Sequence, residues 1–207
     1  MQNLLKKKDP INEFWDWFVT NKETFEDLPR HDADYAHNQL RLISHELQKV
    51  SGDLLVEVSR NADGLRDLTI TAEGNTQKFP IIGEIVGRAP EIPRWSVTAF
   101  RQPMPAGTVL RAGDIEYDPS EMFFEAYNDN GDLDVLVYAK NLARVEKEKA
   151  FHLGMVLMDN FLGEYDMAVS IRRFGFRDLD EAEEEDSLYP LLELPGFVAN
   201  FHRTKNN

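Results

Sequence analysis

The sequence predicts one α+β domain over residues 1–207, in which helices pack on one face of a mainly antiparallel sheet. Two observations carry this prediction. Apolar residues recur every three or four positions in the first 50 residues, which is the period of an amphipathic helix. In several later stretches they alternate with polar residues, which is the period of a half-buried strand. A long helical pattern near residue 150 then separates two groups of strands, as is typical of an α+β fold.

Two helices are expected over residues 9–50. Asp9 can accept a hydrogen bond from the free N–H groups of the first helical turn, and Pro10 suits the first helical position because it has no N–H to lose. The second helix runs from about residue 32 to residue 50, and Gly52 is well placed to end it.

The most aromatic stretch of the chain is NEFWDWF, at residues 12–18. The helical period places Phe14 and Phe18 on the core stripe, with Trp15 and Trp17 on its two edges. A ring at the edge of a core can cover apolar atoms while its N–H stays near water. We therefore expect a packed helix face here rather than a platform on which a ligand stacks.

Period-two alternation predicts the strands. In the first of them Leu54, Val56 and Val58 face one way, which is what an antiparallel sheet with one covered face requires. Asn, Asp and Gly between two alternating runs predict a hairpin over residues 122–139. The predicted strands lie at residues 53–59, 67–73, 94–102, within the hairpin 122–139, and at 165–176.

Two further helices are expected within the region of sheet and helices, residues 53–176. The first is short and covers residues 79–90. The second covers about residues 145–162, is apolar nearly all round in its second half, and ends at Gly163. An acidic loop at residues 178–186 and a loose, partly helical tail at residues 187–207 complete the domain.

Composition narrows the classes of function. The net charge is −14, so the phosphates of nucleic acids and of anionic membranes would repel the chain. There is no cysteine, which excludes disulfides and thiolate chemistry and suits a reducing compartment. We also find no secretory signal and no apolar run long enough to span a bilayer, so we expect a cytoplasmic protein with neither nucleic acid nor membrane as partner.

Sequence signatures of catalysis are absent. The chain has no phosphate-cradling glycine loop, serine-nucleophile elbow, HExxH pair or dinucleotide fingerprint. His37 and His45 share one face of the second predicted helix, but Arg41 between them would repel a metal ion. We therefore expect no metal and no cofactor, and the sequence favours a non-catalytic protein over an enzyme.

The favoured hypothesis is a binding or inhibitory protein that presents an acidic surface to a basic protein, as bacterial immunity proteins do towards nuclease toxins. Electrostatic complementarity of this kind mainly speeds association and selects partners. The alternative for the acidic run is a solvated loop without a partner. The oligomeric state stays open. The candidate partner-binding residues are the seven acidic residues of the run: Asp178, Asp180, Glu181, Glu183, Glu184, Glu185 and Asp186.

A second hypothesis is an enzyme or a small-ligand-binding protein whose site is assembled from distant residues. Arg94 and Arg101 flank the stretch WSVTAF, residues 95–100, within the predicted strand 94–102, and arginine is well suited to a carboxylate or phosphate. Glu148 and His152 are four residues apart on the long predicted helix. Under this hypothesis they line one pocket together with Arg94, Trp95 and Arg101. The simpler interpretation of these arginines is ion pairing with nearby acids.

Several stretches together resemble a family of soluble bacterial α+β proteins without an established activity. The stretches are EFWDWF, LLVEVS, LTITAEG, APEIPRWSVTAFRQP and LMDNFLGEYD, and they span residues 13–166. The resemblance implies a fold and assigns no role to any residue.

Overall fold

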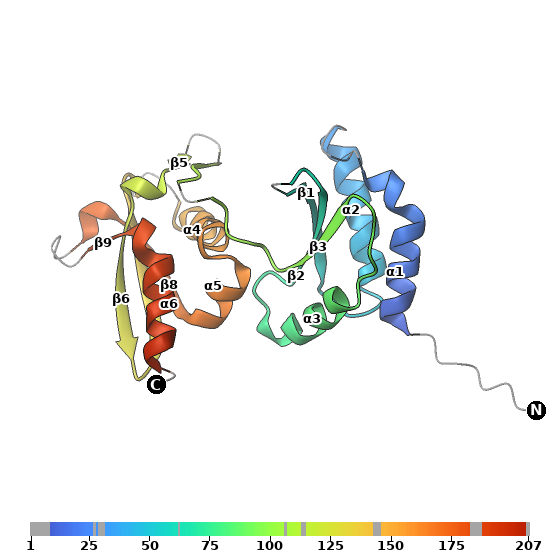
Figure 1. Ribbon diagram of the computed structural model, residues 1–207. Coiled ribbons are helices and arrows are strands. Elements are labelled where there is room, and N and C mark those ends of the chain that lie inside the picture. Colours follow the sequence, from blue (N-terminus) through green and yellow to red (C-terminus); the bar gives the residue numbers. More distant parts are fainter. Residues whose placement is uncertain are drawn as a thin grey trace, which may run out of the picture. The chain divides into compact units, whose positions relative to one another are not determined.

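The chain forms two compact units, which we describe separately: unit 1 is Met1–Arg101 and unit 2 is Gln102–Asn207. The sequence pattern predicts one domain, because no break in composition marks the boundary, which falls next to the short segment Gln102–Pro105. The computed structural model (Figure 1) describes residues 9–26, 28, 32–61, 63–105, 107–112, 115–142, 146–182 and 188–205.

Unit 1 consists of a helix pair followed by a three-stranded sheet with one inserted helix. The strand order is β1-β2-β3, and β1 and β2 form the predicted antiparallel hairpin. Strand β3 runs parallel to β2 because helix α3 lies between them in the chain and returns it to the same end of the sheet. The elements are α1 (Pro10–Asn21), α2 (Ala33–Leu47), β1 (Leu55–Arg60), β2 (Arg66–Thr71), α3 (Phe79–Gly87) and β3 (Trp95–Ala99).

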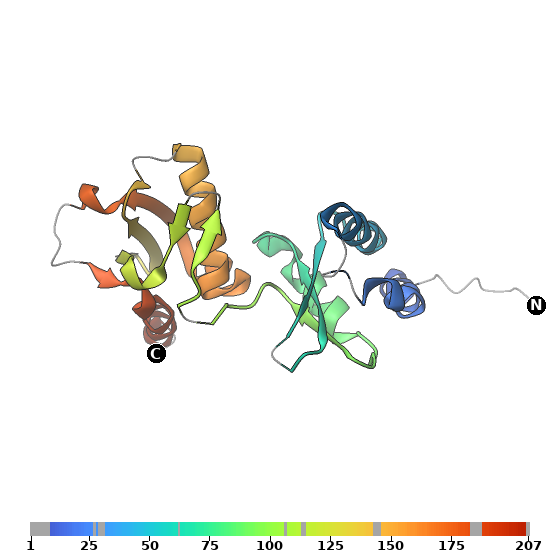
Figure 2. The same ribbon diagram turned by 90° about the horizontal axis from the view of Figure 1, so that it is seen from above.

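The predicted starts of both N-terminal helices are confirmed. A side-chain oxygen of Asp9 accepts a hydrogen bond from the N–H of Ile11 at 3.1 Å, and Asp32 caps α2 in the same way by accepting from the N–H of Tyr35 at 2.9 Å. Helix α2 ends at Leu47, a few residues before the predicted stop. Figure 2 shows α1 and α2 beside each other on unit 1.

Aromatic rings fill the core of unit 1. Phe18 is fully buried and lies 5.2 Å from the ring of Trp95 and 5.9 Å from that of Phe25, measured between centroids. Phe14 is buried as predicted, but Trp15 is buried too and not at the edge of the core. Its Nε1–H donates to the backbone oxygen of Ile85 at 3.0 Å, so a partner on α3 replaces the water that the edge position would supply.

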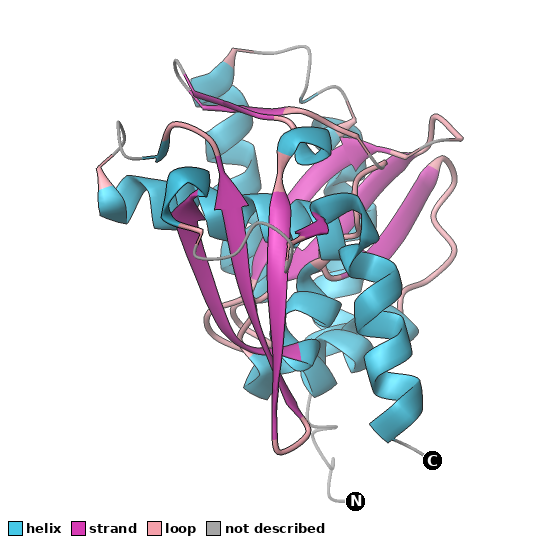
Figure 3. Cartoon of the chain, turned by 90° about the vertical axis from the view of Figure 1, so that its left-hand side faces the viewer, coloured by secondary structure: helices cyan, strands magenta, loops and turns pink. Residues whose placement is uncertain are grey.

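Unit 2 has a small hairpin and a four-stranded sheet of order β8-β7-β6-β9 (Figure 3). Strands β6 and β7 form the predicted hairpin, and β8 runs parallel to β7 after a helical crossover. The elements are β4 (Leu110–Ala112), β5 (Ile115–Tyr117), β6 (Phe123–Asp129), β7 (Asp132–Ala139), α4 (Lys147–Leu162), α5 (Glu164–Ser170), β8 (Ile171–Asp178), β9 (Tyr189–Pro190) and α6 (Leu194–Lys205).

The predicted strand 165–176 is wrong in its first half. Residues 164–170 form helix α5, and the strand begins at Ile171. The buried residues Glu164, Met167 and Ser170 recur every three positions, which is a helical rather than a period-two spacing. Gly163, at φ 83°, ends α4 as predicted and redirects the chain into α5.

The α+β class with helices on one face of the sheet is confirmed, but both sheets are mixed rather than purely antiparallel. In unit 1, Leu68 and Ile70 of β2 join the core with the helices, whereas Asp67 and Thr69 alternate with them and point to the other face. In unit 2, Phe124 of β6 packs against Phe197 of α6. Within the described residues, no helix is long and apolar enough to cross a membrane.

Candidate functional site

The negative charge of the protein is concentrated in unit 2. Unit 1 has 13 basic and 16 acidic residues and a formal charge of −3, whereas unit 2 has 10 basic and 21 acidic residues and a formal charge of −11. Nearly all of the difference comes from the acidic run, which holds seven acidic residues and no basic one. Without the run, unit 2 has a formal charge of −4, close to that of unit 1.

The turn between β6 and β7 carries the densest acidic group among the described residues, which we call the hairpin-tip cluster: Asp129, Asp132, Asp134 and Arg172. The turn itself is formed by Asn130 and Gly131, both at positive φ, which is the conformation that a two-residue hairpin loop requires. A hydrogen bond of 2.8 Å from the N–H of Gly131 to the side-chain oxygen of Asn128 closes it.

One arginine is shared by three aspartates in this cluster. Arg172 donates two hydrogen bonds to Asp134, from Nε at 2.9 Å and from Nη2 at 2.7 Å, and one to Asp129 at 2.7 Å. Asp132 lies 3.6 Å from its Nη1. The three carboxylates exceed the one guanidinium by two negative charges, and the side chains of Asp129 and Asp132 are half exposed at 53% and 51%.

The electrostatics of the cluster follow from this geometry. The hydrogen bonds from Arg172 lower the pKa of Asp134 below its ordinary value of 3.8, although partial desolvation opposes the change. Reciprocally, Asp134 and Asp129 raise the pKa of Arg172. The ion pair between Asp134 and Arg172 therefore holds the charged forms of both groups and fixes their positions at the tip of the hairpin.

The acidic run begins at the opposite end of β8 from Arg172. Asp178 is buried, and its side chain accepts a hydrogen bond from the N–H of Asp180 at 3.1 Å, so it caps a short 3-10 turn instead of pointing into solvent. Asp180 and Glu181 are exposed. The remaining predicted partner-binding residues, Glu183, Glu184, Glu185 and Asp186, lie outside the described residues.

A third acidic group lies on the sheet face of unit 2 that the helices leave uncovered. Glu125 of β6 accepts hydrogen bonds from the hydroxyl of Tyr138, at 2.9 Å, and from that of Tyr127. Burial, together with the hydrogen bond to Glu125, raises the pKa of Tyr138 to about 12. Tyr127 is half exposed, so a carboxylate held by two phenols stands on this face.

The arginines of the alternative ligand site are both in ion pairs in unit 1. Arg94 is exposed and donates from Nη2 to both carboxylate oxygens of Glu26, at 2.8 and 2.7 Å. Arg101 donates from Nε to Glu57 at 2.6 Å and has Glu73 at 3.7 Å.

Trp95 faces away from these arginines, since its ring lies in the core of unit 1 against Phe18. Within the described structure, its Nε1–H has no hydrogen-bond partner.

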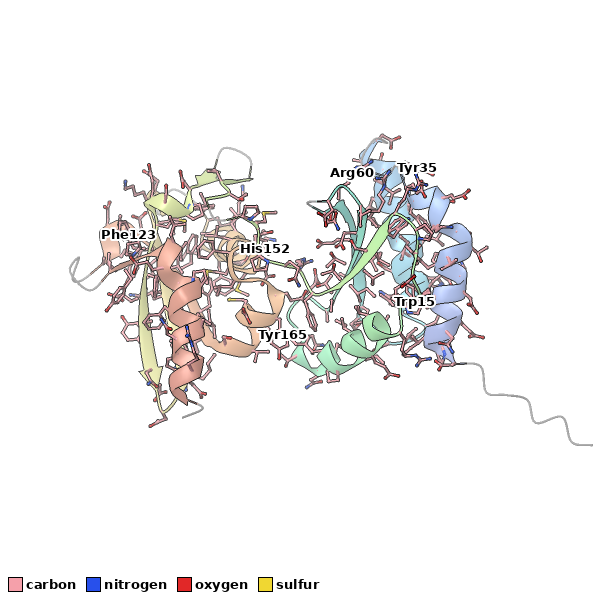
Figure 4. All side chains as sticks on the ribbon, in the orientation of Figure 1. Trp15, Tyr35, Arg60, Phe123, His152 and Tyr165 are labelled. Carbon is pink, nitrogen blue, oxygen red and sulfur yellow. The ribbon has the colours of Figure 1, made fainter. Side chains whose placement is uncertain are left out.

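The other two residues of that alternative belong to unit 2. Glu148 and His152 are exposed on α4, where the helical spacing places them one turn apart. Figure 4 labels His152 on this helix. Groups of three or more acidic or histidine side chains that could hold a metal ion do not occur among the described residues.

A buried polar network on the uncovered face of the unit 1 sheet escaped the sequence prediction. Asp67 accepts hydrogen bonds from three hydroxyls: Thr69 at 2.8 Å, Ser96 at 2.6 Å and Thr98 at 2.7 Å. Asn61 donates to the hydroxyl of Ser96 at 3.1 Å. In the sequence, polar residues occupy every second position of β2. This alternation predicts a strand face that is exposed to solvent, and it does not by itself indicate a buried network. Because the three hydroxyls satisfy the carboxylate, the network stabilises the sheet.

Unit 2 also contains two cavities that are open to solvent. One of about 420 Å³ is mainly apolar and lies between the end of α4 and α6, with Phe161, Leu162 and Val198 in its lining. The other, of about 570 Å³, lies between the first turns of α4 and the end of β8. Neither is lined by the residues of the predicted ligand site.

No family model, no curated protein and no solved structure matches this chain. The likeness to a bacterial family described above therefore rests on the quoted stretches alone. Function has to be argued from the residues themselves.

Proposed function

We propose that this protein is a non-catalytic binding protein whose unit 2 presents an acidic surface to a basic protein partner. The observation that carries the proposal is the uneven distribution of charge, with −11 in unit 2 against −3 in unit 1. A surface of one sign attracts partners of the opposite sign over distances of about a Debye length, which is ~10 Å at 0.1 M salt.

The hairpin-tip cluster and the exposed residues Asp180 and Glu181 are the candidate contact points. The cluster suits recognition because Arg172 fixes the positions of three carboxylates, while the side chains of Asp129 and Asp132 stay half exposed. Fixed charges lose little conformational freedom on binding, so they favour a partner that offers several lysines or arginines. A cytoplasmic location is part of the proposal, since a chain without cysteine suits a reducing compartment.

The test begins with capture of partners from the host lysate on the immobilised full chain, at low and at high salt, with identification by mass spectrometry. The purified basic protein is then used to measure association rates. The double variant Asp129→Asn/Asp132→Asn should slow association by about tenfold or more at low salt, because rim charges act mainly on the association rate.

A matched control comes from unit 1, where Asp16→Asn/Glu23→Gln removes two exposed acidic charges of the same kind. This control should leave the association rate nearly unchanged. If both double variants slow association equally, the surface of unit 2 has no special role. If neither does, a basic partner is not recognised by these charges at all.

A further inference from the structure

The cavity at the start of α4 has the size of a small-ligand site. Its volume is about 570 Å³, and small-molecule sites in proteins occupy roughly 300–1,000 Å³. Helix α4, strand β8 and the turn after β8 all contribute to it. Its lining includes Lys147, Ala150, Phe151, Phe176, Arg177 and Glu181.

One side of this cavity is aromatic. Lys147 lies one helical turn before both Ala150, which is buried, and Phe151, which borders the cavity. The ring of Phe151 is about half exposed, at 49%, and lies 6.1 Å from the ring of Phe174, which in turn lies 6.4 Å from that of Phe176. An exposed ring at the mouth of a cavity offers apolar surface that a ligand can cover.

Four charged side chains line the same cavity, Lys147, Arg177, Asp178 and Glu181, and two of opposite sign among them lack a partner within the described residues. Across the described part of the chain, neither Lys147 nor Glu181 has an ion-pair or hydrogen-bond partner, and they are not within 4.0 Å of each other. By contrast, Arg88, Arg94 and Arg172 are each paired with acidic side chains. A free cation and a free anion around an aromatic wall form the complement of a molecule that carries both charges and a ring.

We propose that this cavity binds a small aromatic zwitterion of the amino-acid type. The carboxylate of the ligand meets the ammonium of Lys147, its ammonium meets the carboxylate of Glu181, and its ring packs on Phe151 and Phe176. Charge-assisted hydrogen bonds of this kind are about twice as strong as neutral ones. Arg177 provides a second cation at the lining, which favours ligands whose carboxylate is extended by a further acceptor.

The proposal concerns a site at the opposite end of β8 from the hairpin-tip cluster, and it shares only Glu181 with the proposed contact points of the partner. Its probes are L-phenylalanine and L-tryptophan, titrated into the full chain and followed by amide chemical shifts. We expect saturable shifts confined to residues 147–151 and 176–181, with a Kd of about 1 mM or below. Three comparators lack one feature each: 3-phenylpropionate lacks the ammonium, 2-phenylethylamine lacks the carboxylate, and L-alanine lacks the ring.

Variants assign the contacts. Lys147→Gln and Glu181→Gln should each weaken binding of L-phenylalanine by about tenfold, the loss expected for one charged hydrogen bond. Lys147→Gln should leave the affinity for 2-phenylethylamine unchanged, since that molecule has no carboxylate. The matched control Lys149→Gln removes an exposed lysine that does not line the cavity and should bind like the wild type.

Three results would overturn the proposal. The first is the absence of saturable shifts with either amino acid. The second is that the three comparators bind as tightly as L-phenylalanine. The third is an equal loss of affinity for L-phenylalanine in Lys149→Gln and Lys147→Gln. All the variants change exposed side chains, so each is expected to fold, and dispersed amide spectra check this directly.

Discussion

Unit 1 and unit 2 repeat one arrangement of secondary structure with different cores and different surfaces. In each, an antiparallel hairpin is followed by a helical crossover and by a strand that runs parallel to the second strand of the hairpin: β1-β2-α3-β3 in unit 1 and β6-β7-α4-α5-β8 in unit 2. The sequence shows no internal repeat that would indicate this similarity between the units. The two units therefore reach the same arrangement through different residues.

The two units differ in the composition of their cores, in their cavities and in their formal charges. Unit 1 packs Phe14, Phe18, Phe25 and Trp95 into one aromatic core and has a formal charge of −3. Unit 2 has a more aliphatic core, two open cavities and a formal charge of −11. Unit 1 thus has the features of a stable scaffold, and the features that suit binding gather in unit 2.

The largest expected effect tests whether the two cores are energetically separate. Phe18→Ala should destabilise unit 1 by about 3–5 kcal/mol, because the ring is fully buried. Hydrogen exchange on the full chain should then show lost protection in residues 9–101 and little change in residues 102–207. The reciprocal variant, Phe124→Ala, should do the opposite. Equal loss of protection in both units, from either variant, would mean that they unfold as one.

The second prediction compares the loss of stability caused by replacing each of two tryptophans of unit 1. Trp15→Phe removes one of two donors to the backbone oxygen of Ile85, which also accepts from the N–H of Arg88 at 3.3 Å. The variant should therefore cost about 0.5–1.5 kcal/mol for the lost hydrogen bond, beyond the loss of ring area. Trp95→Phe removes a donor that is unpaired within the described structure, so it should cost only the loss of ring area. Urea midpoints of the two variants check the order. Equal destabilisation would mean that the hydrogen bond of Trp15 contributes nothing.

The third prediction compares one helical glycine from each unit. Gly83→Ala in α3 meets no atom within 4 Å and should stabilise the protein by about 0.5–1 kcal/mol, because alanine favours helix. Gly154→Ala in α4 should instead destabilise by about 1–2 kcal/mol, since the new Cβ would lie 2.9 Å from the ring of Phe176. Opposite shifts in thermal midpoint are expected, and a stabilising Gly154→Ala would show that the ring of Phe176 moves freely.

The smallest effect concerns pH. The pKa of Asp134 is lowered in the folded protein by Arg172, so the folded state binds this proton less readily than the unfolded state. Stability from this pair is therefore fully present above the ordinary pKa of 3.8 and is lost as pH falls through the lowered value.

The variant Asp134→Asn checks the sign of this dependence. It should be less stable than the wild type near pH 7, and the two should converge in acid. A difference that grows in acid would contradict the assignment. Asp132→Asn, which changes a carboxylate at the longer distance of 3.6 Å from Arg172, serves as the control with a smaller effect.

Local patterns in the sequence were sufficient for most elements because their physical causes are local. Asp9 and Asp32 mark helix starts since a cap needs only a short side chain next to free N–H groups. The hairpin 122–139 follows from alternation around a turn that suits positive φ. Residues 165–170 were predicted as strand because six residues of mixed polarity fit either period, and only packing decided for the helix.

The features of the candidate site also divide into those that the sequence predicted and those that only the structure showed. Sequence alone identified the excess of acidic residues and the run at residues 178–186, because charge is a property of composition. It could not show that Arg172 gathers Asp129, Asp132 and Asp134, since these residues are up to 43 positions apart along the chain. Nor could it show that Asp178 turns inward as a cap, or that Trp95 and Arg94 separate into core and surface.

By itself, then, the sequence determined the helix caps, the strand alternation, the α+β class and the acidic character of this protein, all of which depend on neighbouring residues or on composition. Tertiary structure alone decided the division into two units, the parallel pairing of β3 with β2 and of β8 with β7, and the sites in unit 2. The physical reason is that strand direction and side-chain clusters are fixed where helices return the chain to the sheet, and a local pattern carries no record of that return.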